Sequence, residues 1–195
     1  MNAIPCSIGG ELVTTQLASK MEETMQAFAV RAACFIGELG VPFSEEFDGH
    51  DFGGTHLLAY AGTEPVGTVR VRWFQNFAMP ERLAVIRRFR GHNLGRLLLK
   101  HCCKLAESRG CTTLYSRVPA RLVEYVERQG WRCLEPEVPD DSHVFSYPRI
   151  MVRVISKYLT VRGECGRFDG NRISPLTARW GDPVLGRSVE SRPAK

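Results

Sequence analysis

The sequence predicts an α+β fold built on one mixed, mostly antiparallel β-sheet with helices packed against it. Three observations support this class. Segments 55–60 and 66–74 have the composition and alternation of strands, and a Gly- and Pro-containing connection of hairpin length joins them. Apolar residues recur at helical spacing in 21–36 and again in 94–105. A strand, a helix and another strand follow one another across 83–116, so those two strands are expected to be parallel.

Composition indicates a single folded domain. The chain has 195 residues, of which 44% are hydrophobic and 24% charged, as in ordinary globular proteins. Its net charge is +5, and most of the cations are arginines, which suits an anionic ligand such as a nucleotide cofactor. Nucleic acid would suit this charge as well, but no recognised nucleic-acid motif accompanies the arginines, and we expect no nucleic-acid partner.

Cysteine usage and hydropathy bear on the compartment. The seven cysteines include no CxxC pair and no histidine spacing typical of zinc, so we expect reduced thiols and no metal. No apolar run approaches the length of a membrane span, and the first residues lack the features of a signal peptide. These observations predict a cytoplasmic protein without a membrane partner.

The elements before the centre of the chain are predicted from local patterns. Segment 12–17 is expected to be a strand, and the Met and Phe stripe of the helix at 21–36, which includes Met21 and Met25, is expected to lie in the core. Segment 31–51 is turn-rich and acidic, and its pattern alone favours a solvated surface loop. In the strand at 66–74, three apolar residues alternate with three polar ones, which predicts one buried and one solvent-facing side; the polar residues are Thr68, Arg70 and Arg72.

The stretch from Glu81 to Lys100 carries the strongest functional signal. An apolar run at 83–86 predicts a buried strand, a basic turn containing Gly91 follows, and a helix is expected from Leu94. The first N–H groups of a helix have no partner within the helix and lie at the positive end of its dipole. The stretch is therefore suited to a diphosphate, and Arg88, Arg90 and Arg96 would add positive charge.

This stretch resembles the signature of the GNAT acetyltransferases, an apolar strand followed by Gln or Arg and by glycines three and five positions later. The matching residues are Arg90, Asn93 and Gly95. Asn93 departs from the usual glycine, but asparagine tolerates left-handed backbone angles, so the turn can survive. A second stretch, 119–131, is similar to the closing helix of the same family.

The resemblance implies an α/β/α sandwich in which two parallel strands splay apart around an extended cofactor arm. It implies a GNAT domain over residues 1–158, followed by a tail at 159–195. The implied cofactor is acetyl-CoA, as acyl donor. Its predicted binding residues are Leu83, Ala84, Val85, Arg90, Gly91, His92, Asn93, Leu94, Gly95 and Arg96.

Segment 31–51 is similar to the ElaA-like and acyl-homoserine-lactone-synthase-like branches, where an arginine and an aromatic residue precede a glutamate and an acidic loop. The resemblance places this segment on the acceptor side of the cleft. It supplies Glu38 as a second candidate general base after Glu81, and for each the alternative is a surface or salt-bridged carboxylate. The tyrosine that protonates the leaving thiolate in many members is replaced by Val126, and Tyr125 is expected to be a core ring.

These observations predict an acetyl-CoA-dependent N-acetyltransferase in which a primary amine attacks the thioester directly. The amine acceptor is a small molecule or a peptide, and formation of a homodimer is left open. Transfer of a longer acyl chain and a non-catalytic CoA-sensing module remain as alternatives, the second because of Val126 and Asn93.

Overall fold

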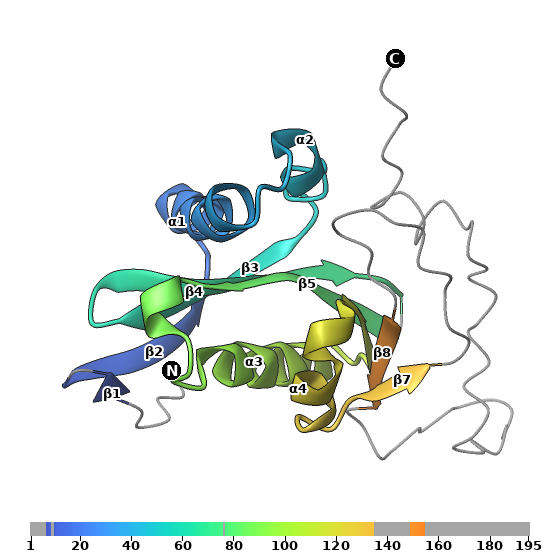
Figure 1. Cartoon of the computed structure of the whole chain (residues 1–195). Coiled ribbons are helices and arrows are strands. Elements are labelled where there is room, and N and C mark those ends of the chain that lie inside the picture. The colour runs from blue at the N-terminus through green and yellow to red at the C-terminus, as the bar shows by residue number, and fades with distance from the viewer. Residues whose placement is uncertain (1–6, 9, 76, 135–148, 155–195) are drawn as a thin grey trace, which may run out of the picture.

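The computed structural model describes residues 7–8, 10–75, 77–134 and 149–154, and its strands form one sheet with helices on both faces (Figure 1). The strands are β1 (Ser7–Ile8), β2 (Glu11–Leu17), β3 (Thr55–Ala61), β4 (Glu64–Trp73), β5 (Phe77–Val85), β6 (Thr113–Val118), β7 (Arg132–Leu134) and β8 (Arg149–Val154). The α-helices are α1 (Met21–Arg31), α2 (Phe43–Glu46), α3 (Leu94–Ser108) and α4 (Val123–Glu127). A π-helix, η1 (Ala32–Glu38), extends α1, and the 3₁₀ turns η2 (Arg87–Phe89) and η3 (Ala120–Leu122) precede α3 and α4.

The sheet has the strand order β1-β2-β3-β4-β5-β6-β8-β7 in the described part of the chain. The strands β2 to β5 form an antiparallel meander, β5 and β6 are parallel, and β8 pairs antiparallel with both β6 and β7. The parallel pair arises because α3 carries the chain back across the sheet between β5 and β6. The predicted mixed, mostly antiparallel sheet is therefore confirmed.

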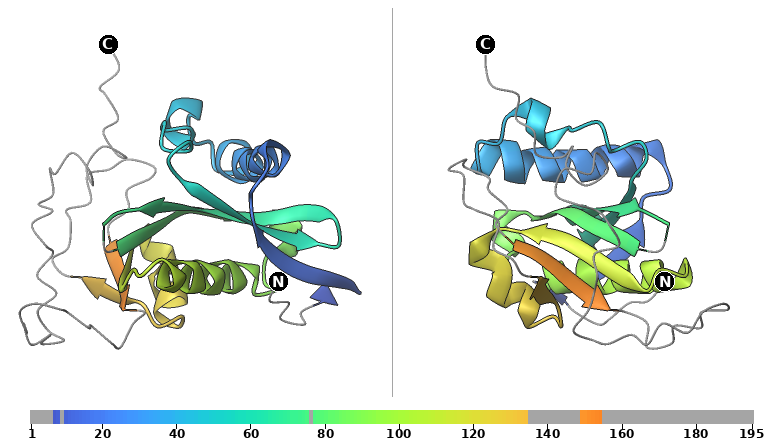
Figure 2. Two further views of the ribbon diagram at one scale, coloured as in Figure 1. Left: turned by 180° about the vertical axis from the view of Figure 1, so that it is seen from behind. Right: turned by 90° about the vertical axis from the view of Figure 1, so that its right-hand side faces the viewer.

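The helices form two layers, with α1 and α2 on one face of the sheet and α3 and α4 on the other (Figures 1 and 2). The main core lies between α3 and the sheet. Its residues are fully or almost fully buried, and they include Leu57, Val69, Ala78, Leu98 and Leu114. The predicted α/β/α sandwich is thus confirmed.

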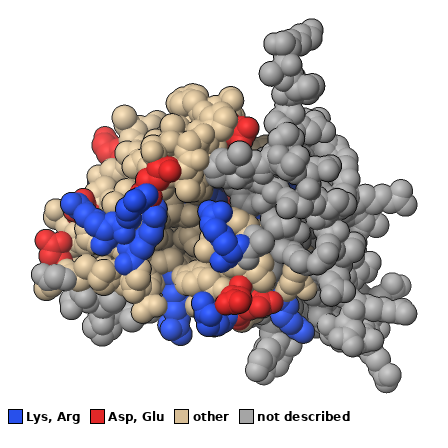
Figure 3. Space-filling model, in the orientation of Figure 1, with Lys and Arg blue, Asp and Glu red and all other residues tan. Residues whose placement is uncertain are grey.

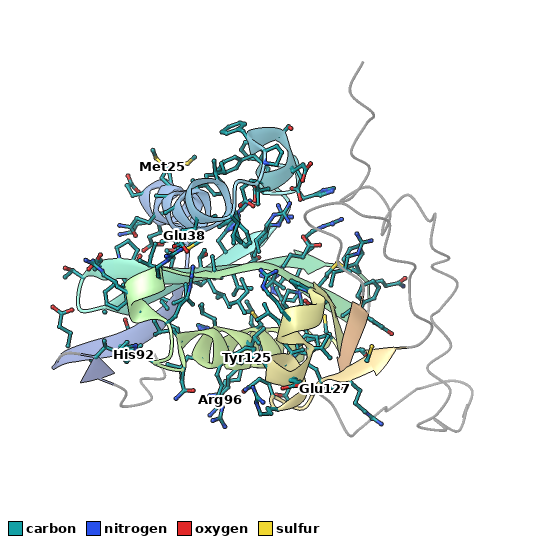
Figure 4. The ribbon with its side chains drawn as sticks, in the orientation of Figure 1. Met25, Glu38, His92, Arg96, Tyr125 and Glu127 are labelled. Carbon is teal, nitrogen blue, oxygen red and sulfur yellow. The ribbon has the colours of Figure 1, made fainter. Side chains whose placement is uncertain are left out.

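The orientation of α1 differs from the expected one. Met21 and Met25 are 68% and 61% exposed, and Met25 points away from the sheet in Figure 4, so their assignment to the core is wrong. The face turned to the sheet instead buries Ala27, Val30 and Arg31. Helical spacing predicts which residues share a face, but the tertiary contacts of Arg31 decide which face turns inward.

The polar face of β4 was expected to face solvent, but most of it is buried. Thr68 and Arg70 are both 0% exposed, because α1 packs over this side of β4. The acidic segment that follows α1 is also partly buried, with Glu46 at 0% and Asp51 at 9% exposure. The expectation of a solvated surface loop at 31–51 is therefore wrong for these two carboxylates, whose partners are described below.

The strand predicted from the apolar run at 83–86 is longer in the structure, where β5 begins at Phe77. It also contains a bulge. Thr68 pairs with Ala84 and Arg70 pairs with Glu81, so β5 has one residue more than β4 between these pairs. Arg82 lies in the extra length and has a φ of 53°, a left-handed angle that is uncommon for residues other than glycine.

The predicted tail at 159–195 lies outside the described residues, and the division at residue 158 remains a prediction. Within the described residues, no helix is both long and apolar enough to cross a membrane.

Candidate functional site

A cavity of about 580 Å³ lies where the parallel strands β5 and β6 separate. The two strands pair at Phe77 with Thr113 and at Ala78 with Leu114, and no further pair follows. Beyond these pairs the cavity is lined by both strands, the start of α3, α4 and η1. Figure 3 shows the corresponding side of the molecule, where basic side chains flank a hollow surface. The splayed parallel pair expected from the family resemblance is present.

Most of the predicted cofactor residues line this cavity. They are Leu83, Ala84, Val85, Arg90, Gly91, Asn93, Leu94 and Gly95. His92 and Arg96 do not line it: both side chains are exposed, and an Nδ1 contact of 3.2 Å joins His92 to the carbonyl of Phe89 (Figure 4). The structure therefore brings together the strand and the turn that the sequence predicted, without these two side chains.

The turn before α3 has the backbone shape that anion binding requires. Asn93 has φ 60° and ψ 12°, a left-handed conformation, and Gly91 has φ 85°. Asparagine adopts this conformation more readily than other residues with a side chain, as the sequence analysis expected. The left-handed Asn93 starts α3 directly after it and leaves the first N–H groups of the helix at the cavity.

Tyr125 on α4 leaves no room for a side chain at position 95, which is a glycine. A Cβ at this position would lie 2.8 Å from the hydroxyl of Tyr125, closer than real Cβ contacts. The Tyr125 ring packs against the core, as expected, but it also lines the cavity and lies against the first turn of α3 (Figure 4). Burial raises the pKa of Tyr125, so its hydroxyl is protonated at neutral pH. Val126, at the usual tyrosine position, is 6% exposed.

Arg90 lies at the mouth of the cavity and has two partners. Its Nε donates to the Val85 carbonyl at 2.9 Å, and its Nη2 lies 2.8 Å from Glu38 Oε2. Glu38, at the end of η1, also pairs with Arg87 at 3.4 Å. Burial opposes ionisation of Glu38, but hydrogen bonds from Arg90 and Arg87 outweigh it and lower the pKa of its carboxyl. The structure thus places this candidate base in a salt bridge beside the cavity and outside its lining.

Glu81, the other candidate base, lines the cavity on β5. Arg70 Nη2 lies 2.7 Å from its Oε2, and Arg72 Nη1 lies 3.3 Å from its Oε1. Among the described residues, Glu81 and Glu38 have no common arginine partner, and they come from different elements, β5 and η1. The structure therefore keeps them as two separate ion-paired carboxylates.

Glu81 is the edge of a larger buried ionic cluster. Arg31 is 0% exposed and pairs with Glu46 and Asp51, each at 2.5 Å. Arg70 is also 0% exposed and reaches Asp48 at 2.7 Å and Asp51 at 3.0 Å. Each of these charges requires its partners, because an unpaired charge in the interior is very costly. The cluster joins α1 and the acidic segment to β4 and β5.

Arg82 brings the same cluster to the β5 bulge. Its Nε lies 3.2 Å from Glu46 Oε2, and its Nη2 lies 3.2 Å from Asp48 Oδ2 and donates to the Glu45 carbonyl at 2.5 Å. Arg82 also lines the cavity. These contacts hold a left-handed residue in place at the point where β5 leaves β6, although its sequence context shows no sign of a bulge.

Sequence reasoning also missed two other residues of the cavity wall. Ser116 on β6 donates through Oγ to the Pro80 carbonyl on β5 at 2.8 Å, so it bridges the two strands where they separate. Trp131, after α4, is 2% exposed and also lines the cavity. Trp131 ends the stretch 119–131, but that motif alone assigned it no place in a cavity. Only the pairing of β5 with β6 identifies Ser116. Among the described residues, no group of three or more His, Cys, Asp or Glu side chains is arranged to hold a metal ion.

Comparisons with known proteins agree with this geometry. The model of a family described as "Acetyltransferase (GNAT) family" matches residues 19–131. YjcF of Bacillus subtilis, an uncharacterised N-acetyltransferase, is 29% identical over 118 residues, which cover 60% of this chain and 84% of that protein.

Solved structures show the same fold. An acyl-CoA N-acyltransferase from Pseudomonas aeruginosa superposes with a TM-score of 0.61 at 22% identity, covering 73% of this chain and 99% of that one. ElaA of Escherichia coli superposes with a TM-score of 0.62 at 19% identity, again covering 73% of this chain and 99% of that one. ElaA therefore shares the fold of this chain, and the resemblance of segment 31–51 to the ElaA-like branch stays a prediction.

Proposed function

Because the chain belongs to the GNAT family of acetyltransferases, whose members use acyl-CoA donors, we propose that it transfers an acetyl group from acetyl-CoA to a primary amine. The amine attacks the thioester directly, without an acyl-enzyme. The observation that carries this proposal is the cavity between β5 and β6, which runs from Glu81 to the N-terminus of α3.

The start of α3 is suited to the diphosphate of the donor. The backbone N–H groups that follow Asn93 have no helical partner, and the absence of a side chain at Gly95 lets a ligand approach the first turn. Arg90 adds a cation at the cavity mouth. Its pairing with Glu38 orients the guanidinium before the donor arrives.

The exposed edge of β5 is suited to the thioester. Since β6 does not pair with β5 beyond Ala78, the strand between Leu83 and Val85 faces the cavity, and a backbone N–H there polarises the carbonyl. The ionic contacts of Arg82 keep the bulge in one conformation and so fix the direction of these N–H groups.

The proton transfers are assigned to two residues of the cavity wall. Glu81 accepts a proton from the amine, directly or through water, since a free alkylamine is mostly protonated at neutral pH. Tyr125 is protonated at neutral pH and lies against the first turn of α3, so it replaces the missing tyrosine at Val126 as the donor to the thiolate. Glu38 acts through Arg90 in this scheme and not as the base.

The acceptor is proposed to be a small-molecule or peptide amine. Cys34, Cys102 and Cys111 are free thiols in the described part of the chain, which supports a reducing, cytoplasmic environment.

The proposal is tested by calorimetry with acetyl-CoA and by a thiol-release assay over a panel of amines. Arg90→Glu reverses a charge at the cavity mouth and is expected to weaken acetyl-CoA binding by at least tenfold. Arg128→Glu makes the same change at an exposed position directly after α4, outside the cavity, and is the matched control. Equal affinity of Arg90→Glu and the control would refute the assigned cofactor site.

Turnover separates the proposed enzyme from its alternatives. Acetyl-CoA binding without thiol release on any amine would favour a CoA-sensing module. Competition between acetyl-CoA and longer acyl-CoA donors separates acetyl transfer from longer-chain transfer: tighter binding and faster turnover of a longer donor would overturn the acetyl assignment.

A further inference from the structure

A second cavity, of about 390 Å³, lies between β2 and the side of α3 opposite the proposed cofactor site. It shares no lining residue with the first cavity. The left view of Figure 2 shows β2 lying beside α3. Nothing in the proposed acetyl transfer uses this second cavity, so its chemistry is considered by itself.

The floor of the second cavity is apolar. It is formed by Val13 and Leu17 from β2 and by Leu97 and Leu105 from α3. Val13 is 1% exposed, whereas Leu17 is 39% exposed, so the floor rises from the core to the surface. An apolar group bound here would cover Leu17, which water otherwise contacts.

The rim is basic. Lys100 and Lys104 lie one helical turn apart on α3, and both line the cavity. Among the described residues, no carboxylate lies within salt-bridge distance of either lysine, although most arginines around the cofactor cavity have such partners. Two positive charges at the rim of one cavity attract an anion, which the lysines would hold by charge-assisted hydrogen bonds.

Polar groups between the rim and the floor complete the site. His101 lies between the two lysines in sequence, and its Nδ1 is 3.1 Å from Thr15 Oγ1 on β2. Burial and the charge of Lys104 lower the pKa of His101, so the ring is neutral at physiological pH. It therefore offers hydrogen bonding without adding a third charge. Gln16 and Ser108 line the same space.

We propose that this second cavity binds a small organic anion with an apolar body, of the class of a medium-chain carboxylate, with its head between Lys100 and Lys104 and its body on the floor of Val13, Leu17, Leu97 and Leu105. Size and charge together select this class. Inorganic phosphate would leave the apolar floor uncovered, and a polyanion such as nucleic acid would require a longer series of cations than these two lysines.

Binding is tested by titration of the whole 195-residue chain with octanoate. The titration is monitored by calorimetry and by ¹H–¹³C spectra of the histidines. 1-Octanol and octylamine have the same apolar body without the negative charge. Octanoate is expected to bind at least tenfold more tightly than either, and the His101 ring signal, assigned with His101→Gln, is expected to move with the octanoate concentration.

Substitution of the lysines locates the site. Lys100→Gln combined with Lys104→Gln is expected to weaken octanoate binding by about tenfold or more. Lys20→Gln, at the exposed start of α1, is the matched control and is expected to bind octanoate as the unsubstituted protein does. Both lysines are exposed, so the fold is expected to survive their substitution.

Three results would overturn this proposal. They are no binding at millimolar octanoate, equal affinity for octanoate and octanol, and an octanoate affinity that is lowered by Arg90→Glu but unaffected by the paired lysine substitution. The last result would place the anion in the cofactor cavity. None of these readouts depends on acetyl transfer, so the second site and the proposed function succeed or fail separately.

Discussion

Replacement of Gly95 by alanine tests the packing of α4 on the cofactor turn. The added Cβ would lie 2.8 Å from the Tyr125 hydroxyl, where an ordinary contact begins at 3.4 Å, so the ring must withdraw by about 0.6 Å. The next nearest atoms, Tyr125 Cζ at 3.7 Å and a Leu83 methyl at 3.8 Å, leave enough room. The conflict therefore comes from a single oxygen atom.

The effect of Gly95→Ala on the free energy of unfolding depends on whether residue 125 has a hydroxyl group. Overpacking of this kind costs about 1–3 kcal/mol, whereas Gly→Ala within a helix gains about 1 kcal/mol. Gly95→Ala is therefore expected to lower the free energy of unfolding by up to about 2 kcal/mol when Tyr125 is present. In a Tyr125→Phe protein the same change is expected to raise it by about 0.5–1 kcal/mol.

Urea unfolding of the four proteins in this double-mutant cycle measures both effects, and the expected coupling is about 1–3 kcal/mol. Acetyl-CoA affinity, measured in parallel, is expected to fall for Gly95→Ala, because the displaced ring narrows the cavity and the added methyl group lies at the first turn of α3. If Gly95→Ala changes the free energy of unfolding by the same amount with tyrosine and with phenylalanine at position 125, the contact between Gly95 and Tyr125 does not control this turn. That result would refute the reasoning.

Three further predictions concern the ionic cluster. Glu81→Gln is expected to lower kcat by about 10²–10⁴ with acetyl-CoA affinity unchanged, and kcat within threefold of the original would exclude Glu81 as the base. Arg70→Met removes the cation that Asp48, Asp51 and Glu81 share, leaving three carboxylates with one fewer positive charge among them, and is expected to cost about 3–5 kcal/mol in urea unfolding. Arg128→Met, at an exposed control site, should stay within about 0.5 kcal/mol. Burial raises the pKa of Asp48, but hydrogen bonds and charge from Arg70 outweigh it and hold that pKa well below its ordinary 3.8. This stabilisation is therefore present above about pH 4 and is lost as the pH falls further, and Asp48→Asn should flatten the pH dependence of unfolding; an unchanged slope would contradict this.

The fold and the backbone of the turn before α3 could be predicted because their signals are local. The run at 83–86, the turn around Gly91 and the spacing after Leu94 each reflect the conformational preferences of a few adjacent residues. The strand before the turn and the helix after it occur where they were expected, and Asn93 adopts the left-handed angle.

The residues proposed to take part in catalysis were harder to predict because contacts between distant segments define their positions. Tyr125 was expected in the core, since its place in the motif says nothing of the glycine on another helix that it contacts. Nothing in the sequence around Arg82 indicates an irregular strand. Its left-handed φ accompanies contacts with α2, which lies 36 or more residues earlier in the chain.

The sequence by itself determined the order of strands and helices, the parallel pair and the phosphate-type turn, because hydrophobic periodicity and turn chemistry act over short distances. Only the tertiary structure decided which polar residues are buried. Arg70 has the alternation of a solvent-facing residue, yet α1 covers it and carboxylates from the acidic segment and β5 neutralise it. A charge enters the interior only where opposite charges converge on it, and that convergence depends on how distant segments pack together.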